Sequence, residues 1–196
     1  LGRFENRTPT FDDPLLDQLR AATKRAVPDF EKGIYAIDHG QYSKAAAHFA
    51  AGLEVEPDNV RARTSYARAL HLSGDAAGAG RELNRALAAD PDLVLANFLQ
   101  AVLMQQSGDL EGATRHYRRT LELDPDHAGA LFYLANLDLL TGRYRESAEG
   151  YRAALRVNPE IAPARLLALV ADYRSSVPEQ QILAALDALI TKHPDD

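Results

Sequence analysis

The sequence predicts an all-α protein built as a solenoid of antiparallel helical hairpins. Glycine, proline and a small residue each recur at a spacing of 34 residues through four copies. The three rows are Gly40, Gly74, Gly108 and Gly142; Pro57, Pro91, Pro125 and Pro159; and Gly33, Ala67, Ala101 and Ala135. Within each copy the apolar residues recur at the spacing of one helix face. Such a period indicates a repeat protein, in which each unit packs on its neighbours.

Each 34-residue unit is expected to contain a first and a second helix. The glycine row lies between the two periodic segments, and glycine readily adopts the left-handed conformation that ends a helix. The proline row follows the second segment, which proline cannot continue. An acidic residue comes next in every copy, and we expect it to cap the following helix or to complement its dipole. These acids are Asp58, Asp92, Asp126 and Glu160.

The row of small residues predicts where the two helices of a hairpin cross closely. A side chain larger than alanine would force the backbones apart at such a crossing. The second helices supply bulky residues at the same period, namely Phe49, Leu83, Tyr117 and Tyr151. We therefore expect small residues of the first helices to pack against large residues of the second.

The chain is expected to divide as follows, from the N-terminus onward. Residues 1–13 show no periodicity and are predicted to be extended or mobile. Residues 14–25 are predicted to form an N-terminal helix, because an Asp precedes Pro14 in the first turn and an apolar stripe follows. Four regular repeats follow at 26–59, 60–93, 94–127 and 128–159. In residues 160–196 Ser176 replaces the row glycine and the second helix starts late, so we predict a degenerate fifth repeat with a capping helix.

Four segments of the second helices resemble the tetratricopeptide repeat family. They are AAAHFAAGLEVEP, GAGRELNRALAADP, GATRHYRRTLELDP and SAEGYRAALRVNP. The resemblance implies a right-handed superhelix that acts as a protein-binding scaffold. The chain departs from the family pattern in having no Trp, and in placing Asp138 where the first helix usually carries an apolar or aromatic residue.

Composition excludes several classes of protein. A net charge of -6 argues against nucleic acid as the main ligand, because such binding depends on clustered Lys and Arg. The absence of cysteine excludes disulfides, thiolate nucleophiles and Cys-based metal sites. No apolar run is long enough to span a bilayer. The excess of Arg over Lys and the abundance of Ala favour a bacterial source, with periplasm and cytoplasm both open.

No motif indicates catalysis, a cofactor or a metal site. The histidines form neither an i, i+4 pair nor an HExxH segment, and the serines lack a nucleophile elbow. The row glycines are turn residues and not a phosphate loop. We therefore expect no enzymatic activity and no cofactor, although the sequence leaves paired-carboxylate catalysis open. The basic stretch RHYRR, from Arg115 to Arg119, is interpreted as a solvated, salt-bridged helix face.

The resemblance implies a concave groove lined by one face of each first helix. Three rows at the repeat period fall on this face: Phe30, Thr64, Phe98, Phe132 and Leu166; Ile34, Arg68, Val102, Asn136 and Val170; and Val27, Arg61, Leu95, Gly129 and Pro163. The predicted partner-binding residues are Arg61, Thr64, Arg68, Phe98, Val102, Phe132 and Asn136. Alternatively, some of these side chains pack against the neighbouring repeat. The carboxylate clamp of some family members is not expected, because Phe, Thr, Leu, Val or Gly stands at most of its positions.

We therefore expect a non-catalytic scaffold whose groove binds a protein or peptide segment with apolar or aromatic anchors. One alternative is that a second copy fills the groove and makes a homo-oligomer, or that the chain's own N-terminus, with Phe4 and Phe11, makes an autoinhibited module. Another is an accessory domain of a larger enzyme or envelope-assembly protein.

Overall fold

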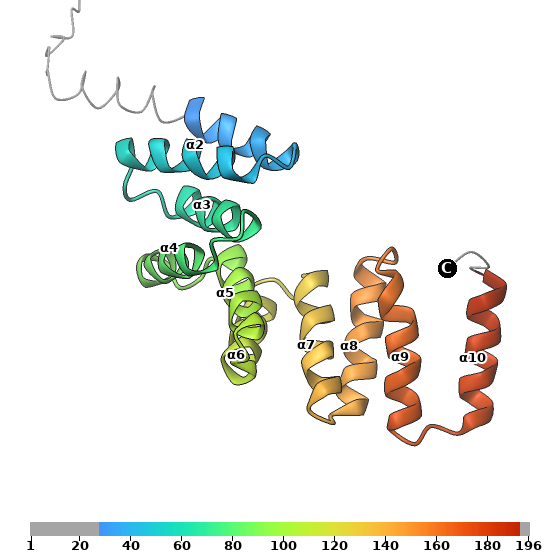
Figure 1. Ribbon diagram of the computed structural model, residues 1–196. Helices are drawn as coiled ribbons and strands as arrows, with labels where there is room; N and C mark the ends of the chain where they lie inside the picture. Colours follow the sequence, from blue (N-terminus) through green and yellow to red (C-terminus); the bar gives the residue numbers. More distant parts are fainter. Residues whose placement is uncertain (1–27, 193–196) are drawn as a thin grey trace, which may run out of the picture. The chain divides into compact units, whose positions relative to one another are not determined.

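The computed structural model describes residues 28–192, and every regular element in that range is an α-helix (Figure 1). Helical structure runs from 28 to 38 and then through nine labelled helices. They are α2 (Tyr42–Val55), α3 (Val60–Leu72), α4 (Ala76–Ala89), α5 (Val94–Gln106), α6 (Leu110–Leu123), α7 (Ala128–Leu140), α8 (Tyr144–Val157), α9 (Ala162–Arg174) and α10 (Glu179–Lys192). The predicted all-α fold is confirmed over these residues. The segments expected at 1–13 and 14–25 lie outside the described residues.

The chain forms two compact units. Unit 1 ends at Glu82 and unit 2 begins at Leu83, so the division falls inside α4. The core of unit 1 is formed by Phe49 and four buried alanines, with Phe30, Ile37, Tyr66 and Leu70 packed against it. The core of unit 2 is built around two fully buried tyrosines, Tyr117 and Tyr151.

The four row glycines make the turns between first and second helices. Gly40, Gly74, Gly108 and Gly142 have φ values of 69°, 95°, 87° and 79°, which is the left-handed region. The amide of the residue after each glycine donates to a carbonyl of the helix that has just ended, as in Asp109 N to Met104 O at 2.9 Å and Arg143 N to Asp138 O at 2.8 Å. This is the bonding pattern of a Schellman C-cap, and it explains the glycine period.

The fifth turn keeps this geometry without a glycine. Ser176 has φ 69°, and Val177 N donates to Asp172 O at 3.1 Å. A residue with a Cβ in the left-handed region costs about 1–2 kcal/mol, because Cβ approaches the following carbonyl oxygen.

Ser176→Gly is expected to raise the free energy of unfolding by up to about 1 kcal/mol, since relief of this conformation exceeds the added entropy of a glycine in the unfolded chain. Denaturant melts followed by circular dichroism measure the effect. The matched control is Ser175→Gly, because Ser175 has φ -84° and its hydroxyl donates to Asp172 O at 2.9 Å. This control should lower stability, and equal shifts in the two variants would contradict the assignment of strain to Ser176.

The row of small residues is buried at the helix crossings. A Cβ added to Gly33 would lie 2.9 Å from the ring of Phe49 in unit 1. In unit 2, Ala101 belongs to the cluster around Tyr117, and Ala135 belongs to the cluster around Tyr151. The small residues of the first helices therefore do pack against the large residues of the second within each unit.

The prediction that the acid after each proline caps the following helix is wrong. The N-cap is the residue after that acid, so the caps of α3 and α7 are Asn59 and His127. These side chains accept hydrogen bonds from Ala62 N at 2.9 Å and Ala130 N at 3.0 Å. The helices α5 and α9 follow Leu93 and Ile161 and have no side-chain cap.

Asp138, which departs from the family pattern, is buried and paired. Its carboxylate accepts a hydrogen bond from Arg143 Nε at 2.7 Å, and Arg143 Nη2 lies 2.7 Å from the same oxygen, Oδ1, in an ion pair. One repeat later Asp172 is equally buried and forms an ion pair with Arg152. Each buried charge is tolerated because a guanidinium compensates for the lost hydration. Arg143, just before α8, does so for Asp138, and Arg152, on α8, does so for Asp172.

The two helices of the last hairpin differ in how they pack. Helix α9 contributes Ala164 and Ala168 to the cluster around Tyr151. Helix α10 is mostly exposed, and Leu183 on it keeps 51% of its surface accessible.

Candidate functional site

The predicted groove residues fall in both units. In unit 1, α3 carries Arg61, Thr64 and Arg68. In unit 2, α5 carries Phe98 and Val102, and α7 carries Phe132 and Asn136.

On α3, the two arginines are exposed and the threonine between them is not. Arg61 and Arg68 face solvent. Thr64 is buried, and its hydroxyl donates to Val60 O of the same helix at 2.9 Å. Of the three groove residues predicted on α3, only the two arginines are therefore available at the surface of unit 1.

In unit 2, the two predicted phenylalanines are half-buried against core tyrosines. The ring of Phe98 lies 6.0 Å from Tyr117, and the ring of Phe132 lies 5.7 Å from Tyr151. Phe30 and Phe49 repeat the contact in unit 1, at 6.4 Å. Both phenylalanines therefore contribute to repeat packing as well as to the surface.

Tyr133 joins the two phenylalanines and was not among the predicted site residues. Its ring lies 6.0 Å from Phe98 and 5.4 Å from Phe132, and it stacks on Tyr117 at 5.9 Å with an interplanar angle of 8°. The side chain keeps 36% of its surface accessible. Since the equivalent residues of the other repeats, Ser65, Leu99 and Leu167, are not aromatic, the repeat rows contain no signal for this position.

Two hydrogen bonds orient the polar groups beside these rings. Tyr151 donates its hydroxyl to Asn136 Oδ1 at 2.6 Å, and Tyr117 donates to Gln105 Oε1 at 2.8 Å. Burial raises the pKa of Tyr117, with a smaller contribution from Tyr133, and burial also raises the pKa of Tyr151. Both hydroxyls therefore stay protonated as donors, and Asn136 is held by the core.

Helix α9 extends the predicted rows with exposed apolar side chains. Leu166, Val170 and Tyr173 keep 55%, 41% and 66% of their surfaces accessible, and their spacing places them on one side of the helix. We call the following set the first-helix face of unit 2: Leu95, Phe98, Val102, Phe132, Tyr133, Asn136, Leu166, Val170 and Tyr173.

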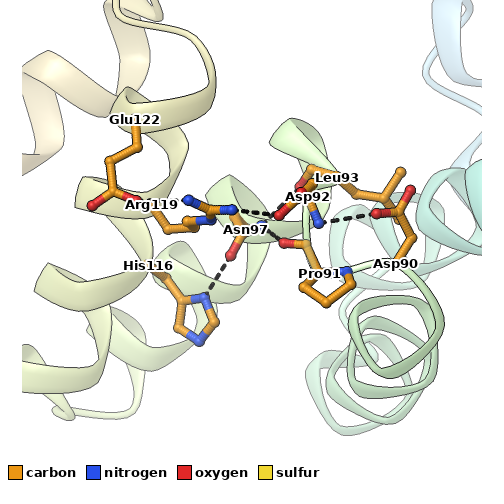
Figure 2. A network of polar contacts seen from close by, with 8 residues as sticks. All are labelled: Asp90, Pro91, Asp92, Leu93, Asn97, His116, Arg119 and Glu122. Atoms are coloured by element: carbon orange, nitrogen blue, oxygen red, sulfur yellow. Dashed lines mark hydrogen bonds and ion pairs between the residues drawn. The ribbon is translucent and has the colours of Figure 1, made fainter.

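A polar network joins α6 to the start of α5 (Figure 2). Arg119 forms ion pairs with Asp92 and, at 2.7 Å, with Glu122. Asn97 Nδ2 donates to Pro91 O at 2.8 Å, so its Oδ1 faces His116 Nδ1 at 3.0 Å and must accept from it. The proton on Nδ1 that this requires is present in the imidazolium and in one neutral tautomer. Burial, aided by Arg115 and opposed by Asp109, lowers the pKa of His116 and so favours that neutral tautomer.

The other two arginines of the basic stretch are open to solvent. Arg115 and Arg118 are exposed and line a pocket of about 450 Å³ together with Arg143. The pairing of Arg119 agrees with a salt-bridged face, whereas no ion pair of Arg115 or Arg118 occurs within residues 28–192.

The described residues contain neither a metal-binding cluster nor a membrane-spanning helix. No cluster of three or more His, Cys, Asp or Glu side chains in residues 28–192 is arranged to hold a metal ion. Nor does any helix in this range have the length and apolar character needed to cross a membrane.

The helical hairpins that recur every 34 residues define a helical-repeat protein. Tetratricopeptide repeat models match residues 30–94 and 104–172, together more than half of the chain. The chain therefore belongs to the tetratricopeptide repeat family. Members of this family are typically non-catalytic protein-interaction scaffolds. A search of curated protein sequences found no significant match.

Several solved structures share the fold. MamA from Desulfovibrio magneticus RS-1 superposes with a TM-score of 0.73 at 13% identity, over 88% of this chain and 97% of that one. YrrB, described as a tetratricopeptide protein with an unusual peptide-binding site, gives 0.69 at 17% identity, over 93% and 94%. The first repeat domain of Spaghetti (RPAP3), bound to the HSP90 peptide SRMEEVD, gives 0.58 at 25% identity, over 61% and 94%.

Proposed function

We propose that this chain is a non-catalytic scaffold that binds a segment of another protein on the first-helix face of unit 2. The observation that carries the proposal is the exposed stripe on α9, formed by Leu166, Val170 and Tyr173. Exposed apolar side chains that gather on one side of a helix are typical of interaction sites, whereas single exposed ones are ordinary.

The ligand is a segment with apolar or aromatic anchors. Leu166 and Val170 continue, one repeat further on, the rows of Phe132 and Asn136. Helices α7 and α9 both pack on α8 and contribute to the core cluster that contains Tyr151. A face of this composition removes apolar anchors from water, and the edge of Tyr133 adds an aromatic contact.

Two structural relatives support a peptide as the ligand. The peptide of one of them is acidic, which differs from the ligand proposed here. YrrB carries a peptide-binding site, and Spaghetti holds the peptide SRMEEVD. The face of unit 2 offers no Lys or Arg in the predicted rows, so it suits apolar anchors better than an acidic tail.

The proposal is tested with peptides selected from a random phage-displayed library against the chain. The double variant Leu166→Ala/Tyr173→Ala should weaken a selected peptide by about 30-fold or more, because loss of central anchors typically costs about 2 kcal/mol. Fluorescence anisotropy gives the affinities, and circular dichroism should show unchanged helicity because both side chains are mainly exposed.

The matched control is Leu183→Ala on α10, which is equally exposed but lies off the face. This variant should bind the peptides as the unmodified chain does. Unchanged affinity in the double variant would refute the proposed site. A dimer in light scattering that the double variant abolishes would instead assign the face to a second copy of the chain.

A further inference from the structure

The network of Figure 2 has a counterpart 34 residues further on, in which the acceptors remain and the donors are lost. Three acceptor positions are kept, because Asp90, Pro91 and Asp92 correspond to Asp124, Pro125 and Asp126. The three donors are replaced by residues without a donor side chain: Asn97 by Leu131, His116 by Gly150 and Arg119 by Ala153.

A side chain donates to the carbonyl oxygen of three of the four repeat prolines, and Pro125 is the exception. Pro57 O accepts from Arg63, Pro91 O accepts from Asn97 at 2.8 Å, and Pro159 O accepts from Arg165 at 2.6 Å. In each case the donor lies six residues after the proline. At the remaining repeat the residue in that position is Leu131, and within residues 28–192 no side chain donates to Pro125 O.

A pocket lies where these donors are missing. It has a volume of about 450 Å³ and is lined by Pro125, Asp126, Leu131, Ala153, Arg156 and Val157. One repeat earlier the corresponding pocket has a volume of about 420 Å³ and contains Asn97, His116 and Arg119 in its wall, so the two pockets differ in their polar lining and not in their size. Asp92 is there neutralised by Arg119, whereas Asp126 forms no ion pair with any residue that the structure describes.

We propose that this pocket binds the guanidinium group of an arginine side chain from a partner protein, in the place that Arg119 takes one repeat earlier. A guanidinium carries five N–H donors in one plane, so it can bond a carboxylate and a carbonyl together. Asp126 supplies the carboxylate and Pro125 the carbonyl, while Leu131, Ala153 and Val157 offer an apolar wall for the methylene stem.

The positive charge of Arg156 affects how strongly the pocket can bind a guanidinium. Arg156 stands where the preceding repeat has Glu122, which is the second acid that pairs with Arg119 in the network of Figure 2. An acid of that network is therefore replaced here by a cation. Arg156 lines the same pocket and opposes a second positive charge there. Removing this charge should therefore tighten the binding of a guanidinium, and a partner that places an acid beside its arginine is favoured.

This site is independent of the first-helix face. Leu131, Ala153, Arg156 and Val157 lie outside the rows that form that face. A failure of either proposal therefore leaves the other standing.

The test is an NMR titration of the full chain with Nα-acetyl-L-arginine methylamide, followed at the backbone amides of residues 124–131 and 150–157. Saturable shifts at these amides are expected, with weak affinity because the probe is small. Nα-acetyl-L-norleucine methylamide, which keeps the apolar stem and lacks the guanidinium, should not produce them.

Three variants and a control sharpen the result. Asp126→Asn should weaken the probe by about tenfold, since a charge-assisted hydrogen bond becomes a neutral one. Ala153→Arg should abolish binding because its own guanidinium can pair with Asp126 as Arg119 pairs with Asp92, and Arg156→Gln should strengthen binding. The control Asp92→Asn, the matched acid of the preceding repeat, should leave binding unchanged. Absence of shifts in the unmodified chain, equal shifts with the norleucine compound, or full binding by Asp126→Asn would overturn the proposal.

Discussion

Tyr117→Ala should lower the free energy of unfolding by about 3–5 kcal/mol, the range found when buried aromatic side chains are truncated. The ring is fully buried, packs with Ala101 and Ala113, and stacks on Tyr133. Truncation leaves a cavity at the centre of unit 2 and removes the hydrogen bond to Gln105. Denaturant melts followed by circular dichroism measure the loss.

The matched control for this variant is Tyr173→Ala in the same unit. Tyr173 is mostly exposed, so its truncation should change stability by less than about 1 kcal/mol. Similar losses in the two tyrosine variants would show that the core of unit 2 is not centred on Tyr117. The control also separates folding from binding, because Tyr173 belongs to the proposed binding face.

Ala101→Leu should destabilise the protein by about 1–3 kcal/mol through overpacking. Ala101 is fully buried in the cluster of Tyr117, so a larger side chain must displace the ring or the backbone. Gln180→Leu, at an exposed position of α10, should change stability by less than about 0.5 kcal/mol. Equal melting of these two leucine variants would contradict the close crossing.

A double variant tests the pairing of small and large residues directly. In Ala101→Leu/Tyr117→Ala, the new leucine can occupy part of the space that the tyrosine ring leaves. The combined loss should therefore be smaller than the sum of the single losses. Strict additivity would mean that the two positions do not share one packing site.

Periodicity predicted the fold because the features that define the hairpin depend on backbone geometry. The left-handed φ of Gly142 and the close approach of Gly33 to Phe49 each restrict the residue type. The same kind of residue therefore recurs at these positions in every regular repeat and is visible in the sequence. The division within α4 leaves no such mark, because Ala79, Leu83 and Ala86 continue the pattern across it.

The candidate site was harder to predict because a row position does not determine burial. Phe98 and Phe132 occupy the predicted rows, yet each ring is held against a core tyrosine. Thr64 occupies the same row and satisfies its hydroxyl within its own helix. Tyr133 lies outside the rows and is aromatic in one repeat alone, so only side-chain packing reveals it.

The regular turns also determine where this chain tolerates changes in length. One residue inserted within a helix rotates everything beyond it by about 100°, so Ala135, for example, would leave its contact with the next helix. One residue inserted in the proline turns, as between Pro91 and Leu93, shifts no residue within its own helix. Natural or engineered insertions should therefore accumulate at the proline turns and avoid the glycine turns, where the residue after the glycine donates to a carbonyl five residues earlier, as Asp109 N does to Met104 O.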